Sequence, residues 1–131
     1  MKHDDLFLLQ YIFSSDDDFN PVEDIYVGYD ESFNLILLLE HTDHDFPLFN
    51  CHTYALIKKE DAFSLARKLS IPMTELPTVI SNAPDDSYYE IINPTLNEVR
   101  DCFKDIIDCF TDEKCRFQIV RKYGKYGYHC I

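Results

Sequence analysis

Five potential metal ligands lie close together in the chain, directly after an apolar run. The run LILLLE at residues 35–40 is followed by HTDHDF, and NCH comes a few residues later. Zinc sites use imidazole, carboxylate and thiolate ligands, and a strand end can support them. The sequence therefore leaves open a metal-binding or hydrolytic loop, with His41, His44, Asp45, Cys51 and His52 as its candidate ligands. The alternative is a solvated acidic loop, because such side chains are costly to bury. We adopt this alternative and predict no cofactor.

Other signatures of catalysis are absent from the sequence. There is no GxSxG, GxxxxGK[ST] or GxGxxG motif, and the three glycines could hardly build a phosphate-binding loop. The carboxylates are so numerous that none stands out as an acid–base pair. Cys102 and Cys109 lie beside the apolar stripe of a predicted helix and away from its start, so we expect buried thiols rather than nucleophiles. The sequence therefore favours a binding protein; it gives no support for an enzyme and does not exclude one.

Negative charge is concentrated in the first half of the chain. Up to Ile57, twelve acidic residues face one base, Lys2, which leaves only −1 of the net −12 for the remainder. An acidic surface repels nucleic-acid and membrane phosphates and attracts basic partners. The composition therefore predicts a protein partner, with neither nucleic acid nor membrane as a target. Residues 114–125 are basic, and we expect them to pair with the acidic half.

The acids of the first half fall at predicted loops and turns, with tyrosines nearby. If they share one face, they mimic the charge density of a nucleic-acid backbone and could block the basic active site of a nuclease toxin. Tyrosine is a favoured anchor at protein interfaces. The alternative for the acids is ordinary acidic solubility. The predicted partner-binding residues are Asp16, Asp17, Asp18, Tyr26, Tyr29, Asp30, Glu31, Asp43 and Asp45.

The order of predicted elements indicates the fold class. Residues 6–13 are predicted to form a strand or a short helix. After a helix at 59–69, a short second helix is predicted with Thr74 as its N-cap. Thr95 and Glu98 form the predicted capping box of the clearest helix. This order predicts one α+β domain over residues 1–131, with an antiparallel or mixed sheet of about four to six strands and two or three helices on one face. The further strands are predicted at 24–29, 33–40, 52–57, 88–92 and 116–121, and the helices at 59–69, from Thr74 and at 95–110.

Size, charge and layout indicate a class of protein. The chain has no apolar run of about 18 residues and a poor signal peptide, and its five cysteines lack a CxxC pair, so we predict a cytoplasmic protein with reduced thiols. Over its whole length it resembles small acidic bacterial toxin-immunity proteins. That resemblance implies a binding protein that occludes the active site of a cognate toxin. The alternative is a regulatory or structural subunit of a larger assembly that associates through the basic tail, and the oligomeric state stays open.

Overall fold

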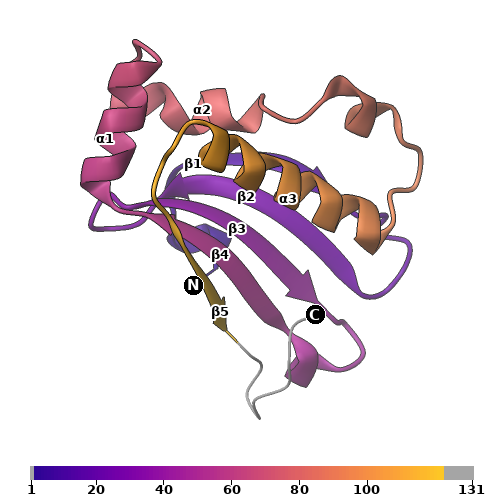
Figure 1. Ribbon diagram of the computed structural model, residues 1–131. Coiled ribbons are helices and arrows are strands. Elements are labelled where there is room, and N and C mark those ends of the chain that lie inside the picture. Colours follow the sequence, from indigo (N-terminus) through magenta and orange to yellow (C-terminus); the bar gives the residue numbers. More distant parts are fainter. Residues whose placement is uncertain (1, 123–131) are drawn as a thin grey trace.

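A five-stranded antiparallel sheet forms the centre of the computed structural model, which describes residues 2–122 (Figure 1). The strands lie in the order β1-β2-β3-β4-β5, so each strand pairs with its neighbours along the chain. This architecture, with three helices beside the sheet, confirms the predicted α+β class. The strands are β1 (Phe7–Ser14), β2 (Val22–Tyr29), β3 (Leu35–Thr42), β4 (Cys51–Ile57) and β5 (Gln118–Lys122).

The three helices lie together on one face of this sheet (Figure 1). They are α1 (Lys59–Lys68), α2 (Leu76–Ser81) and α3 (Leu96–Asp112), and they join β4 to β5. The predicted capping box of α3 is confirmed, since Thr95 Oγ1 accepts from the Glu98 N–H at 3.3 Å and Glu98 Oε1 accepts from the Thr95 N–H at 3.1 Å. The predicted N-cap of α2 is wrong, because a 3₁₀ turn, Met73–Glu75, occupies that position and Glu75 precedes the helix.

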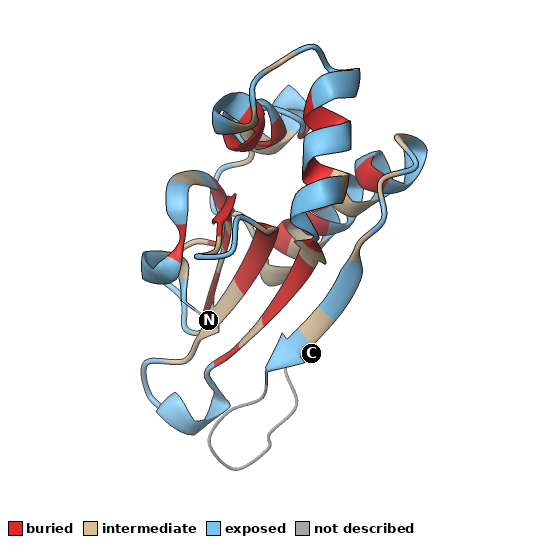
Figure 2. Cartoon of the chain, turned by 90° about the vertical axis from the view of Figure 1, so that its left-hand side faces the viewer, coloured by how far each residue is buried: buried red, intermediate tan, exposed pale blue. Residues whose placement is uncertain are grey.

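The central strands are buried on both faces, which explains the continuous apolar run in β3. Leu35, Leu37 and Leu39 pack in the larger core beneath the helices, whereas Ile36 and Leu38 belong to a smaller cluster on the opposite face. Adjacent residues of a strand point to opposite faces, so an uninterrupted run of leucine and isoleucine is what two covered faces require. Figure 2 shows this contrast between buried central strands and the largely exposed β5.

The strand predicted at residues 88–92 is wrong. The chain instead forms a 3₁₀ helix, Asp86–Glu90, before α3. Its start is fixed by Asp85, whose carboxylate accepts from the Ser87 N–H at 2.9 Å. The Tyr88 hydroxyl donates to the Asp105 carboxylate on α3, so this β-rich segment is held on the helical layer.

The cysteines are only partly as expected. Cys102 is fully buried on α3, as predicted, and burial first and Asp105 second raise its pKa to about 12. The predicted burial of Cys109 is wrong, because this thiol lies on the exposed side of α3. Cys51, in contrast, is disulfide-bonded, so the prediction of a wholly reduced set is wrong at that position. Within residues 2–122, the helices are too short or too polar to traverse a lipid bilayer.

Candidate functional site

Two acidic loops meet at one end of the sheet. The β1–β2 loop carries three successive aspartates, and the β3–β4 loop carries two more. In an antiparallel sheet of this strand order, both loops lie at the same end of the strands. The Asn20 side chain joins them, because its Nδ2 donates to Asp43 Oδ1 at 2.9 Å and to Asp45 Oδ2 at 3.2 Å. Its Oδ1 accepts from the His44 N–H at 2.8 Å. We call the resulting surface the acidic loop pair; it comprises Asp16, Asp17, Asp18, Asp43, Asp45, Phe19, Phe46 and Phe49.

Exposed aromatic rings accompany these carboxylates. Phe19 and Phe46 are 69% and 61% exposed, and Phe49 is 41% exposed. The rings of Phe46 and Phe49 pack edge to face with centroids 5.9 Å apart. Apolar rings beside charged groups are the composition of a protein-binding surface, in which rings enter pockets and charges set orientation.

The conformation of the β3–β4 loop depends on Asp43. Its Oδ1 accepts backbone N–H groups from Asp45 at 3.0 Å and Phe46 at 2.9 Å, while its own N–H donates to Asn50 Oδ1 at 2.6 Å. The hydrogen bond from Asn20, and then those from the backbone, lower the pKa of the Asp43 carboxyl below 3.8. Asp43 therefore carries its negative charge while it orders the loop.

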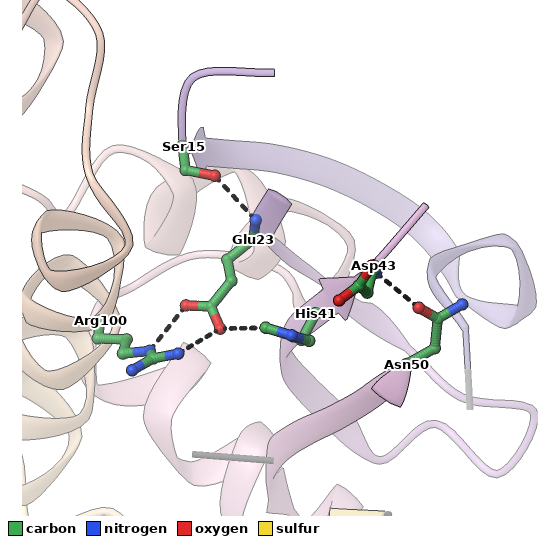
Figure 3. A network of polar contacts seen from close by, with 6 residues as sticks. All are labelled: Ser15, Glu23, His41, Asp43, Asn50 and Arg100. Atoms are coloured by element: carbon green, nitrogen blue, oxygen red, sulfur yellow. Dashed lines mark hydrogen bonds and ion pairs between the residues drawn. The ribbon is translucent and has the colours of Figure 1, made fainter. Parts of the chain in front are cut away.

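A buried ion triad, comprising Glu23, His41 and Arg100, lies behind the acidic loop pair (Figure 3). Glu23 of β2 is fully buried, and its carboxylate accepts from Arg100 Nε at 2.8 Å and Nη2 at 2.9 Å. His41 Nδ1 of β3 lies 2.7 Å from Glu23 Oε2. The Glu23 N–H also donates to Ser15 Oγ at 2.9 Å. The Glu23 carboxylate therefore ties α3 to two strands, and the Glu23 backbone N–H holds the start of the first acidic loop.

The protonation state of Glu23 follows from these contacts. Burial alone would raise its pKa, but the hydrogen bonds from His41 and Arg100, with their charges, bring it below 4.5. A buried ion pair contributes little net stability compared with apolar side chains of the same size, whereas losing one partner is costly. We therefore interpret the triad as fixing the position of α3 relative to β2 and β3, more than as adding to the free energy of unfolding.

The structure brings together five of the nine predicted partner-binding residues. Asp16, Asp17, Asp18, Asp43 and Asp45 all belong to the acidic loop pair.

The other four predicted residues lie elsewhere. Asp30 and Glu31 occupy the β2–β3 turn at the opposite end of the sheet, where Asp30 Oδ1 accepts from the Ser32 N–H at 2.9 Å. Tyr29 is 1% exposed beneath the helices, and its hydroxyl donates to the Met73 carbonyl at 2.6 Å, so it cannot anchor a partner. Tyr26 lies on the face without helices. The idea of a single acidic face is therefore wrong, because the turns at the two ends of β2 point in opposite directions.

The candidate metal ligands of the β3–β4 loop do not converge. His41 faces Glu23, Cys51 is disulfide-bonded, and no three of the five candidates place ligand atoms within 4.8 Å of one another. In the described part of the chain, the one group that meets this distance is formed by Asp16, Asp17 and Asp18. Carboxylate oxygens suit Mg²⁺ or Ca²⁺, although three exposed aspartates serve equally well as a charged surface.

Sequence reasoning missed Asn20, Glu23 and Arg100. A signal was present for Glu23, which is in phase with Ile25 and Val27 on the buried side of β2. A charge in the buried phase of a strand requires a partner. Arg100 is 77 residues away in the chain, and no local pattern identifies it as that partner. Comparison of the chain with family models, curated proteins and solved structures found no match.

Replacing Asn20 with alanine is expected to uncouple the two acidic loops. The substitution removes the hydrogen bonds to Asp43, Asp45 and His44, so the pKa of Asp43 should rise toward 3.8 and the unfolding free energy should fall by about 1 kcal/mol. An NMR titration of the Asp43 carboxyl carbon measures the first effect. Asn82→Ala is the matched control, since Asn82 bonds the Thr78 carbonyl on α2. An unchanged Asp43 titration in Asn20→Ala would contradict the bridging role.

Proposed function

We propose that this protein is a non-enzymatic binding protein that neutralises a basic, nuclease-like toxin through the acidic loop pair. The observation that carries the proposal is the Asn20 bridge, because it turns two separate acidic loops into one surface. Five carboxylates on that surface complement the cationic groups with which a nuclease holds phosphate. The resemblance in size and charge to immunity proteins supports the same conclusion.

The aromatic rings supply what charge alone does not. Surface charges mainly raise association rates and select partners, whereas buried rings contribute most of the binding energy at interfaces. Phe19 and Phe46 stand exposed on the two bridged loops, so one partner surface could contact both rings and the carboxylates together.

Order in the free protein favours tight binding. Flexible loops lose conformational entropy when they bind, and a loop that is already fixed loses less. Here Asp43 orders the second loop internally, and the Ser15–Glu23 contact fixes the start of the first. The Asp16 N–H also donates to the Pro94 carbonyl at 2.9 Å, which ties the first loop to the segment before α3.

The test measures binding to the products of the genes adjacent to this one, each screened for toxicity, and compares the wild type with a triple variant, Asp17→Asn, Asp18→Asn and Asp45→Asn. These substitutions remove three charges but leave Asp16 and Asp43, whose carboxylates order their loops. We expect the association rate to fall about tenfold and its dependence on salt to weaken, measured by surface plasmon resonance. Growth of cells that express the toxin should then no longer be fully rescued.

The matched control removes the same number of charges from the helices. It carries Glu60→Gln, Asp108→Asn and Asp112→Asn, all exposed and outside the acidic loop pair. This variant should bind and rescue as the wild type does. Wild-type protein that binds and neutralises none of the products of the adjacent genes would refute the proposed function. Equal losses in both triple variants would show that net charge, and not this surface, is responsible.

A further inference from the structure

The sheet face opposite the helices is covered by a short N-terminal strap, which we define as residues 2–6. Its centre is the 3₁₀ turn His3–Asp5. Beneath it lies the smaller apolar cluster, in which Ile36 and Leu38 are fully buried and Tyr54 is 7% exposed. The partly buried residues Tyr26, Leu9, Leu56 and Val120 extend this cluster over neighbouring strands. A five-residue segment therefore covers an apolar surface contributed by all five strands.

The strap binds this face much as a separate peptide would. Its polar anchor is His3, whose N–H donates to Glu40 Oε2 at 3.0 Å and whose Nδ1 lies 2.6 Å from Glu40 Oε1. The His3 ring also stacks on Tyr26, with centroids 4.4 Å apart and an interplanar angle of 11°. Its apolar anchor is Leu6, which is 8% exposed and packs with Ile36 and Leu38. The contacts of the strap with this face are thus made by an imidazole and an aliphatic side chain three residues apart.

Two backbone features lie beside the strap. Gly28 of β2 gives it room, because a Cβ there would lie 2.9 Å from the Phe7 carbonyl oxygen and 3.0 Å from Leu6 Cβ. Leu8, the second residue of β1, has a φ of 53°, a conformation that is strained for a leucine.

We propose that the N-terminal strap is a displaceable plug on a second binding site, which accepts a segment of a partner protein with a cationic or imidazole group three residues before an aliphatic one. Glu40, beside Asp24 in the strand register, provides the negative charge for the first group. The cluster of Ile36, Leu38 and Tyr54 receives the second. This site is independent of the acidic loop pair, because it lies on the helix-free face of the sheet.

The test is binding of a labelled peptide, KHDDLF, which copies residues 2–7. Wild-type protein should bind it weakly, since the tethered strap competes at a millimolar effective concentration. Full-length protein with His3→Ala and Leu6→Ala should bind it at least tenfold more tightly, measured by fluorescence anisotropy. Adding Glu40→Gln to that variant should remove most of the gain, whereas adding Glu60→Gln, on the other face, should not.

Further arms keep the proposal open to refutation. Adding Gly28→Ala to the double variant should weaken peptide binding, because its Cβ would meet the peptide's copies of Leu6 and Phe7. If neither variant folds by circular dichroism, millimolar peptide should shift the Tyr26 and Tyr54 ring signals of the wild-type protein in NMR spectra. The proposal is overturned if the folded His3→Ala, Leu6→Ala variant binds the peptide no more tightly than the wild type does, or if adding Glu40→Gln leaves its affinity unchanged. It is also overturned if the Tyr26 and Tyr54 ring signals do not shift when peptide is added. Toxin neutralisation is measured separately, so the two proposals fail independently.

Discussion

Replacing Arg100 with alanine is expected to lower the unfolding free energy by about 3 kcal/mol. The substitution leaves the fully buried Glu23 carboxylate without its two-point partner, and losing one member of a buried pair costs about 3–5 kcal/mol. The lower end of that range applies because His41 still bonds to Glu23 and the Arg100 side chain is 30% exposed. Urea denaturation followed by circular dichroism measures the change.

Two further variants separate charge pairing from the loss of packing. Lys104→Ala, on the exposed side of α3, should change the unfolding free energy by no more than about 0.5 kcal/mol. Combining Arg100→Met with Glu23→Leu removes both charges and should recover most of the lost stability. A double variant as unstable as Arg100→Ala would mean that the triad contributes through packing alone.

The same carboxylate determines how stability depends on pH. The folded state holds the pKa of Glu23 below 4.5, so its contribution is fully present above that pH and is lost as the pH falls through the folded value. In Arg100→Ala, the pKa of Glu23 rises because a lowering partner is gone. The loss of stability between neutral pH and acid pH should therefore be smaller in the variant than in the wild type, as denaturation curves repeated at several pH values would show.

Two adjacent leucines of β3 should differ in their contributions although both are fully buried. Leu37→Ala opens a cavity between the sheet and the helices and should cost about 3–5 kcal/mol. Leu38→Ala opens one beneath the strap and should cost about 2 kcal/mol, since a segment with few anchors can settle into the space. Equilibrium unfolding in urea measures both values.

The control for this pair is Leu48→Ala in the β3–β4 loop. Leu48 is 40% exposed, so its truncation should cost less than about 1 kcal/mol. If Leu38→Ala proves as costly as Leu37→Ala, the strap is packed as rigidly as the helical layer. That result would also weaken the case for a displaceable strap.

The sequence predicted the elements that local chemistry determines. Thr95 and Glu98 cap α3 as their spacing requires, and the apolar runs of β2 and β3 pair as a hairpin. It failed where tertiary contacts decide. Tyr26 and Tyr29 are three residues apart in one strand and so face opposite sides, but only the placement of the helices determines which of them is buried.

The sequence predicted the charged residues of the candidate site but not how the two loops that carry them are arranged. Asp16 and Asp43 lie in loops, as the residues around them indicate. Only the strand order places those two loops at one end of the sheet and Asp30 at the other end. The hydrogen bonds of Asn20 form because the two loops lie at the same end of the sheet, and no local sequence pattern indicates them. Tyr88 shows the opposite failure, because its β-rich segment forms a 3₁₀ helix that packs against the sheet and α3 without pairing with a strand.

The strand order also constrains how the chain can fold. The first four strands form successive hairpins with short connections, so each can pair soon after its residues become available. The pairing of β4 with β5 instead closes a loop of some 60 residues that contains all three helices. Because closing a long loop costs entropy before its contacts form, β5 should join the sheet only after the helices have docked. The last strand therefore completes a structure whose helical layer is already in place.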